Sequence, residues 1–294
     1  MSPVGEFNVK GKIVVITGGG SGIHLELGRL MHSKGAKVII ADLRLTTEAS
    51  EFVNGRDVVF QSTDVTKRHQ LEALITVSEA TFGDVPDVYV AGAGAFEPSW
   101  SNFWDDTEED DYAAVQVNVN HPLKLTRIAT RALLRRNKKG VVLLMASIAG
   151  YSGNFAAPMY STTKHALIGF TRSIGELDAH EGVKVVSICP GIVKTPLWTA
   201  NPTAVARFGY VDEIAISAQQ VAEAELKLIE SGEYPGGTVY EISMEGERTV
   251  PAWNITPPGY DPENPAAGIS VPQEALDRAN APIWEVLARE RGFE

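Results

Sequence analysis

Short apolar runs rich in β-branched residues alternate with amphipathic helical patterns along most of the chain. Strands that alternate with helices in this way form a parallel sheet that is covered by helices on both faces. The sequence therefore predicts an α/β chain with a single doubly wound parallel sheet. The expected strands are 12–17, 37–41, 57–61, 87–91, 140–146, 183–188 and 237–243, and the expected helices are 23–34, 67–82, 112–136, 160–177 and 222–230.

A glycine cluster, Gly18–Gly22, joins the first expected strand to the helical pattern Ile23–Lys34. Glycines let the backbone approach a pyrophosphate, and a helix N-terminus offers N–H groups and a positive dipole. A strand, a glycine turn and a helix in this order are the dinucleotide-binding fingerprint of a Rossmann-like domain. We therefore expect a phosphate-binding turn here.

Asp42 ends the second expected strand, about 20 residues beyond the glycines. A carboxylate at this place can bind both ribose hydroxyls of NAD and would repel the extra phosphate of NADP. The alternative is an aspartate that only caps a helix or a turn. The sequence favours NAD as the cofactor, although Arg44, two residues on, could soften the discrimination.

Tyr160 and Lys164 lie four residues apart at the start of an amphipathic run that reaches Leu177. This spacing places both side chains on the same side of a helix. A neighbouring ammonium group favours the phenolate, so we expect the pKa of Tyr160 to fall from ~10 toward the working pH. Such a tyrosine can take a proton from an alcohol or give one to a carbonyl. The alternative is a pair on a solvated helix face.

Composition excludes several other classes of protein. The formal net charge of -11 argues against a nucleic-acid or anionic-membrane surface. No apolar run approaches the ~18 residues of a membrane span, and Met1–Lys10 lacks a signal-peptide pattern. The single cysteine, Cys189, excludes an internal disulfide and fits a reducing compartment. We expect a cytoplasmic protein without a metal site.

Two segments stand apart from the alternating pattern. Residues 251–294 form a proline-rich extension to the expected domain of residues 1–250, with a short terminal helix inside Gln273–Arg291 that Pro282 interrupts. The segment Glu97–Asp111 carries two tryptophans and seven carboxylates, so we expect it at the surface, where it could act as a lid.

With these residues in place, residues 10–245 resemble the short-chain dehydrogenase/reductase family. Thr17–Ile23 resembles its cofactor turn, Asp64–Val65 its adenine-contacting pair, and Pro190–Thr195 the loop that holds the nicotinamide carboxamide. The resemblance implies the following cofactor contacts besides Asp42, Tyr160 and Lys164: Gly18, Ser21, Gly22, Ile23, Asp64, Val65, Gly92, Ile192, Val193 and Thr195.

Asn118, Ser147, Tyr160 and Lys164 match the catalytic tetrad of that family one by one. The resemblance implies an NAD-dependent enzyme that interconverts a secondary alcohol and a ketone. Tyr160 would transfer the proton, and Lys164 would lower its pKa and hold the nicotinamide ribose. Ser147 would orient the substrate oxygen, and Asn118 would position a relay water near Lys164.

The second half of the chain narrows the expectation. Tyr160–Arg172, Ile188–Thr195 and Leu228–Ile242 look most like hydroxyprostaglandin dehydrogenases. The family's usual interface implies a homodimer or homotetramer built on the helices that start near Tyr112 and Tyr160. The substrate pocket is expected from Tyr151–Met159, the loop after Gly191 and Leu197–Phe208. Aromatic and apolar residues there favour an apolar or aromatic substrate: Tyr151, Phe155, Met159, Leu197, Trp198 and Phe208.

Two positions depart from the family pattern. His24 stands where the third glycine of the turn is expected, and Ala91–Gly92 replaces an asparagine pair. We expect the His24 ring to be neutral, to point to solvent or lie against the cofactor, and to weaken NADH binding by crowding. These departures motivate an alternative function, a cofactor-binding but redox-inactive sensor or scaffold.

Overall fold

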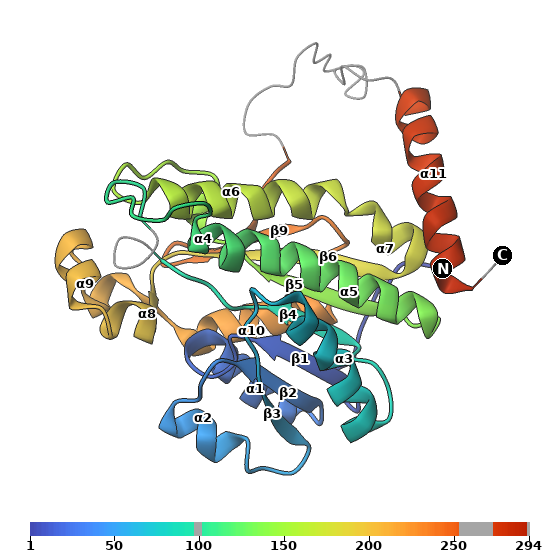
Figure 1. Ribbon diagram of the computed structural model, residues 1–294, viewed down its shortest axis with the longest axis horizontal. Helices are drawn as coiled ribbons and strands as arrows, with labels where there is room; N and C mark the ends of the chain where they lie inside the picture. Colours follow the sequence, from blue (N-terminus) through green and yellow to red (C-terminus); the bar gives the residue numbers. More distant parts are fainter. Residues whose placement is uncertain (97–101, 253–272, 293–294) are drawn as a thin grey trace.

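The computed structural model describes residues 1–96, 102–252 and 273–292. Within them one eight-stranded sheet has the order β10-β9-β6-β5-β4-β1-β2-β3 (Figure 1). The order reverses between β1 and β4, which makes the sheet doubly wound. The strands are β1 Ile13–Thr17, β2 Lys37–Asp42, β3 Val58–Ser62, β4 Val88–Ala91, β5 Gly140–Met145, β6 Val183–Pro190, β9 Val239–Ser243 and β10 Gly246–Thr249.

The expected fold class is confirmed, with one addition at the edge. β10 pairs antiparallel with β9, whereas the other neighbours in this sheet are parallel. Only two residues separate β9 from β10, too few for a parallel crossover, so the chain turns back on itself. A second, small sheet pairs β7 (Val193–Lys194) with β8 (Ile216–Ser217) beside the main one.

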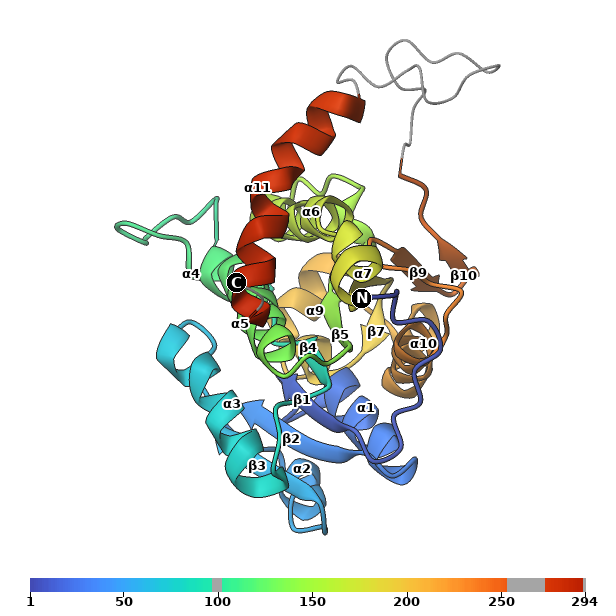
Figure 2. The ribbon, with the colours of Figure 1, turned by 90° about the vertical axis from the view of Figure 1, so that its right-hand side faces the viewer.

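Successive residues of the central strands point to opposite faces of the sheet, and each face has its own core. In β1, Val14 and Ile16 pack toward the layer that contains α1 and α10, while Ile13 and Val15 pack toward α3 and α5. Figure 2 shows the sheet between these two layers. The helices on the first face are α1 Gly22–Ser33, α2 Thr47–Phe52 and α10 Ala218–Glu230, and those on the second are α3 Arg68–Phe82, α5 His121–Arg135, α6 Pro158–Ser173 and α7 Glu176–Glu181.

The expected helix from Tyr160 to Leu177 is divided into α6 and α7. A side chain at Gly175, between them, would lie 2.9 Å from the carbonyl oxygen of Gly236. The chain therefore turns where another segment approaches its backbone closely. Shorter elements that the sequence did not separate are α4 Ala113–Val115, η1 Gln116–Asn120 (a π-helical turn), η2 Ile148–Gly150, α8 Pro196–Thr199, α9 Pro202–Phe208 and η3 Asp212–Ile214.

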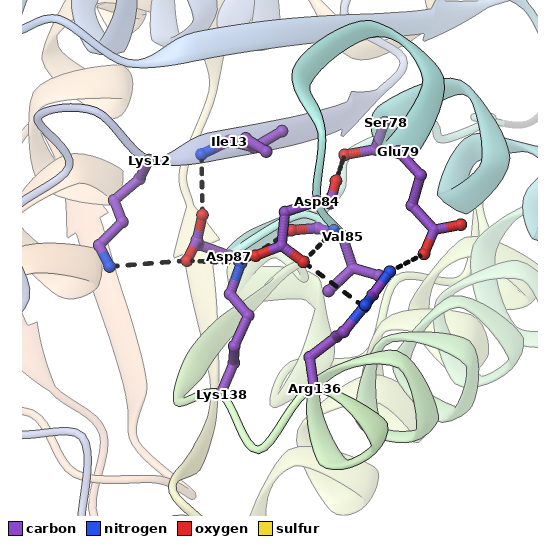
Figure 3. A network of polar contacts seen from close by, with 9 residues as sticks. All are labelled: Lys12, Ile13, Ser78, Glu79, Asp84, Val85, Asp87, Arg136 and Lys138. Carbon is purple, nitrogen blue, oxygen red and sulfur yellow. Dashed lines mark hydrogen bonds and ion pairs between the residues drawn. The ribbon is translucent and has the colours of Figure 1, made fainter.

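A polar network fastens the amino ends of the central strands, where β1 and β4 begin (Figure 3). The carboxylate of Asp87 accepts a hydrogen bond from the Ile13 N–H at 2.9 Å and pairs with Lys12 and Lys138 at 3.5 and 3.1 Å. Lys138 also binds Asp84 at 2.8 Å. Because Asp87 is nearly buried, its pairing with two lysines matters for stability.

The C-terminal helix, α11 (Gln273–Arg291), runs through Pro282 without a break, contrary to our expectation. Pro282 lies on the exposed side of the helix, so the ring meets solvent. The rest of the expected irregular tail, residues 253–272, lies outside the described residues. Figure 1 shows α11 at the end of the molecule opposite α8 and α9. In the described ranges, no helix has both the length and the apolar character needed to cross a bilayer.

Candidate active site

A cleft of about 1110 Å³ opens along the carboxyl ends of the strands, where the order of the sheet reverses. In open α/β sheets this is the position at which ligands bind. The cleft begins at the glycine turn after β1 and continues past Tyr160 to α8. Of the site residues expected from the sequence, those that line it are Gly18, Ser21, Gly22, Ile23, Asp42, Asp64, Val65, Gly92, Ser147, Tyr160, Lys164, Val193 and Thr195.

The glycine turn is packed too closely for side chains at two of its positions. Gly18 has a φ of +70°, and a Cβ there would lie 2.6 Å from the Ala93 nitrogen. A Cβ at Gly20 would lie 2.4 Å from the Arg44 carbonyl oxygen. Ser21 does not cap α1 with its side chain, and the first turn of α1 carries no acidic residue. The backbone N–H groups at the start of α1 therefore suit an anionic ligand, such as a pyrophosphate.

Asp42 and Asp64 mark the far side of the same part of the cleft. Asp42 accepts hydrogen bonds from the N–H groups of Gly20 and Leu43, at 2.9 and 2.7 Å, so its carboxylate is held beside the glycine turn. The hydroxyl of Thr66 hydrogen-bonds to Asp64 at 2.7 Å and holds the pKa of that carboxyl below its usual value. The glycine turn fits the pyrophosphate of a dinucleotide, and the carboxylate of Asp42 fits its adenosine ribose.

Ser147, just after β5, converges in the middle of the cleft with Tyr160 and Lys164 of α6. The phenol of Tyr160 hydrogen-bonds with Ser147. The Ser147 hydroxyl accepts from the Ala149 N–H at 3.2 Å, which caps η2 and fixes the side chain. Lys164 is buried, donates to the Met145 carbonyl oxygen at 2.7 Å, and lies 5.3 Å from the centre of the Tyr160 ring.

The prediction that the pKa of Tyr160 falls is wrong for the protein without a bound ligand. Desolvation raises the pKa of Tyr160 to about 12, although the hydrogen bond with Ser147 acts in the opposite direction. Desolvation also lowers the pKa of Lys164 to about 8. The spacing of the two residues did place them together, but the ammonium group is directed at the Met145 carbonyl and does not offset the loss of water around the phenol.

Asn118 lies in the π-helical turn η1 and is buried behind the cleft. Its side chain accepts from the Ala95 N–H and donates to the Ala95 carbonyl, both at 2.8 Å, and also donates to the Thr163 hydroxyl at 3.1 Å. Asn118 thus joins the segment after β4 to α6. A π-helical turn inside a helix is a common feature of functional sites. Ile192 does not belong to the lining of the cleft, although its neighbours Gly191 and Val193 do.

The substrate end of the cleft is aromatic. Phe96 makes an edge contact with Tyr160 (centroids 4.8 Å apart), and it also packs on Trp198 and Phe208 at 5.1 and 5.3 Å. Trp198 stacks on Tyr210 at 5.4 Å. The sequence identified Trp198 and Phe208 but missed Phe96 and Tyr210. Phe96 follows β4 by five residues and carries no local signal of its role.

Four residues expected in the substrate pocket do not belong to the lining of the cleft: Tyr151, Phe155, Met159 and Phe208. Phe155 is 82% exposed and packs against Trp104 of the acidic segment, whose indole N–H donates to the Phe155 carbonyl at 2.8 Å. The hydroxyl of Tyr151 binds the carboxylate of Glu241 on β9. Residues 97–101 of the acidic segment are outside the described residues. Leu197 and Trp198 do line the cleft, as expected.

His24 belongs to the lining of the cleft, but its ring does not point to solvent, which was one of the two expected orientations. Its exposed fraction is 5%, and it packs on Gly92 with Nε2 3.2 Å from the carboxylate of Glu225 on α10. Glu225 was not identified from the sequence, because a single glutamate in an amphipathic helix carries no sign that it faces inward.

Comparison with known proteins identifies the class of chemistry. Residues 12–205 match the short chain dehydrogenase family model. An uncharacterized oxidoreductase of Staphylococcus aureus (strain MRSA252) is 33% identical over 219 residues, which is 73% of this chain and 89% of the relative. Momilactone A synthase of Oryza sativa subsp. japonica is 35% identical over 220 residues, 74% of this chain and 77% of that protein. The chain belongs to the short-chain dehydrogenase/reductase family of oxidoreductases.

Proposed function

We propose that this protein is an NAD-dependent oxidoreductase that interconverts a secondary alcohol and a ketone on an apolar or aromatic small molecule. Members of its family use NAD or NADP. The observation that carries the proposal is the convergence of Ser147, Tyr160 and Lys164 in one cleft with the glycine turn. A dinucleotide held at the turn and a substrate at the aromatic end would share this cleft.

Tyr160 is the proton-transfer group in this proposal. Its pKa of about 12 keeps the phenol protonated near neutral pH, which suits donation to a carbonyl oxygen as that oxygen gains negative charge. Alcohol oxidation uses the same proton transfer in reverse. Ser147 stabilises the developing charge with its hydroxyl. The nicotinamide, when bound, supplies or accepts the hydride.

Lys164 adds positive charge to the same part of the cleft. A pKa of about 8 leaves most of this group protonated at pH 7. The ammonium group, 5.3 Å from the Tyr160 ring centre, favours electron density on the phenol oxygen during proton transfer. Its remaining donors suit the hydroxyls of a ribose, as in the family. Asn118 holds the part of α6 that carries Lys164, because its side chain donates a hydrogen bond to the Thr163 hydroxyl.

The preference for NAD rests on Asp42. Its carboxylate lines the cleft beside the glycine turn, where a dinucleotide of this family places its adenosine ribose. A negative charge there attracts ribose hydroxyls and repels a phosphate ester. Arg44 lines the same region, so we propose a preference rather than complete exclusion of NADP.

An apolar or aromatic substrate is proposed from the side chains around Tyr160. Phe96 and Trp198 present ring surfaces next to the proton-transfer group and carry few polar atoms with which to bind a sugar. The likeness of the second half of the chain to hydroxyprostaglandin dehydrogenases is consistent with such a substrate and remains part of the proposal.

The test of the chemistry is Tyr160→Phe. This change keeps the ring contact with Phe96 and removes only the hydroxyl, so we expect turnover to be lost while NADH binding is nearly intact. NADH fluorescence titration and turnover on a panel of secondary alcohols and aromatic ketones measure both quantities. Wild-type turnover in the variant would overturn the assignment of Tyr160.

The redox-inactive alternative makes a different prediction for the same panel. Single-turnover absorbance of bound NADH would then stay constant with every ketone, and that of bound NAD with every alcohol. The enzyme proposed here should change the absorbance of the bound nicotinamide with at least one substrate of the aromatic set.

A further inference from the structure

The ring of His24 fills the space that a side chain at Gly92 would need, next to the glycine turn. A Cβ built on Gly92 would lie 2.4 Å from both Cε1 and Nδ1 of the His24 ring and 2.6 Å from its Cγ. Real Cβ atoms essentially never approach other heavy atoms so closely. The ring at position 24 therefore requires a glycine at position 92, and the two unusual residues of this chain form a matched pair.

Glu225 of α10 faces the other side of the His24 ring. The two side chains have exposed fractions of 6% and 0%, and His24 Nε2 lies 3.2 Å from Glu225 Oε1. Among the described residues, neither carboxylate oxygen of Glu225 nor Nε2 of His24 has a hydrogen-bond partner in good geometry, so each is the nearest charged or polar group available to the other. A buried carboxylate needs a compensating partner, so the imidazole and the carboxylate hold each other in place.

Gly92 is itself part of the cleft wall. Its N–H donates to the Thr17 hydroxyl at 3.1 Å, and that hydroxyl also binds the Val90 carbonyl and His121 Nε2. Thr17 belongs to β1 and directly precedes Gly18. The backbone at Gly92 is thus held by Thr17 on one side and by the His24 ring on another.

We propose that His24, Gly92 and Glu225 form one interlocked unit that positions the cofactor-binding turn by joining α1, the end of β4 and α10. His24 is a positioning residue in this unit, because its ring is buried between Gly92 and Glu225. This inference rests on the proposed dinucleotide site for its effect on binding. It reverses our expectation that the His24 side chain weakens NADH binding by crowding.

The experiment is a double-mutant cycle of His24→Gly and Gly92→Ala. Gly92 does not have a positive φ, so alanine is conformationally permitted and only its methyl group matters. In the presence of His24, that methyl displaces the ring, and we expect NADH affinity to fall by about tenfold or more. In the His24→Gly background the methyl meets space, so the same change should have little effect.

Three controls separate positioning from general destabilisation. NADH titrations are made at a temperature at which circular dichroism shows every variant folded, because a purely structural role lowers the melting temperature but leaves that affinity unchanged. Gly153→Ala is the matched substitution, since Gly153 lies outside the helices and the cleft lining, its Cβ meets no atom within 4 Å, and the change should alter neither quantity. Adding Glu225→Gln to His24→Gly removes the unpaired buried carboxylate and should recover melting temperature.

The outcomes distinguish this inference from the proposed function. Effects of the two changes that simply add, in both affinity and melting temperature, would overturn the interlock. A His24→Gly protein that binds NADH more tightly than wild type would also overturn it. If wild type binds neither NADH nor NADPH, the proposed function and the role in cofactor positioning both fail, and strong coupling in melting temperature would then support the packing unit only.

Discussion

At the scale of single residues, the centre of the cleft buries two side chains, Lys164 and Tyr160, whose charged forms are more stable in water. Lys164 is a buried cation whose described hydrogen bond is to a backbone carbonyl, and Tyr160 is a phenol whose pKa is raised by desolvation. Functional sites often keep such destabilising arrangements. Both residues therefore lead to measurable consequences for stability and pH dependence.

Lys164→Met is expected to stabilise the folded protein at neutral pH. Below pH 8 the lysine is charged in both the folded and the unfolded state, and its burial costs the folded state about 3 kcal/mol. Between pH 8 and ~10.4 the folded protein has lost this proton while the unfolded chain keeps it, so that cost shrinks as the pH rises. Guanidinium denaturation from pH 7 to pH 10 measures the difference.

In this experiment Lys124→Met, an exposed position on α5, is the control and should change stability little at any pH. The stability gain of Lys164→Met should be largest near pH 7 and decline toward pH 10. A gain that does not depend on pH, or a loss at pH 7, would show that desolvation of Lys164 is not the dominant effect.

Asp42→Ala should narrow the preference for NADH over NADPH by weakening NADH. One charge-assisted hydrogen bond contributes roughly 1.5–3 kcal/mol, so NADH affinity should fall at least about tenfold. Asp42→Asn is the matched variant, because it keeps an acceptor for the Gly20 N–H and removes the charge that would repel a phosphate. Fluorescence titrations with both dinucleotides measure the ratio. A wild type that binds NADPH more tightly would contradict the assignment.

At the scale of elements, the two ends of the sheet have separate tasks. The carboxyl ends of the strands carry the cleft, and the amino ends carry the polar network around Asp87. α11 belongs to the second end. It docks on α5 through Glu290, which pairs with Arg127 and with Arg131, the latter at 3.0 Å.

Glu290→Ala should release the end of α11 without changing the cleft. The change removes both arginine contacts, while the stacked pair of Trp284 and His180, at 4.1 Å, and the buried side chain of Leu287 remain. We expect faster amide hydrogen exchange in α11 and unchanged NADH affinity. The control is Glu285→Ala, at an exposed position on the same helix, which should change neither hydrogen exchange in α11 nor NADH affinity. A large loss of NADH affinity in Glu290→Ala would show that α11 acts on the cleft.

At the scale of the whole molecule, the outer face of α6 is formed by small and polar side chains. Thr162, His165, Ala166, Gly169 and Ser173 are exposed there. Such a face can lie close to a symmetry-related copy of itself. We propose, as the family resemblance implies, that the protein is a homodimer or homotetramer that uses α5 and α6. A cytoplasmic location likewise remains a prediction.

Gly169→Arg tests this assembly with little risk to the fold. Its Cβ meets no atom within 4 Å in the single chain, and arginine favours a helix over glycine by roughly 0.5–1 kcal/mol. A loss of assembly would therefore come from the interface and not from unfolding. Light scattering at micromolar concentration should show an oligomer for wild type and a smaller species for the variant. A monomeric wild type would contradict the proposal.

Much of the molecule follows from local patterns in the sequence. The alternation of β-branched runs and amphipathic segments determined the doubly wound sheet, because each run must bury both faces under helices. The glycine turn, Asp42 and the pair Tyr160 and Lys164 were also found from spacing, whereas Ser147 was found from the family resemblance. All of them lie at the carboxyl ends of strands or on the next helix, and such ends meet along one edge of a parallel sheet.

Only the tertiary structure decided properties that depend on contacts between distant segments. The pKa of Tyr160 rises because surrounding protein removes its water, and the spacing to Lys164 could not show how complete that removal is. Phe96 reaches Tyr160, and Glu225 reaches His24, across more than sixty positions and two hundred positions of the chain respectively. His24 and Gly92 each looked like a defect in the sequence. The fold brings them together, and the space that one leaves is the space that the other fills.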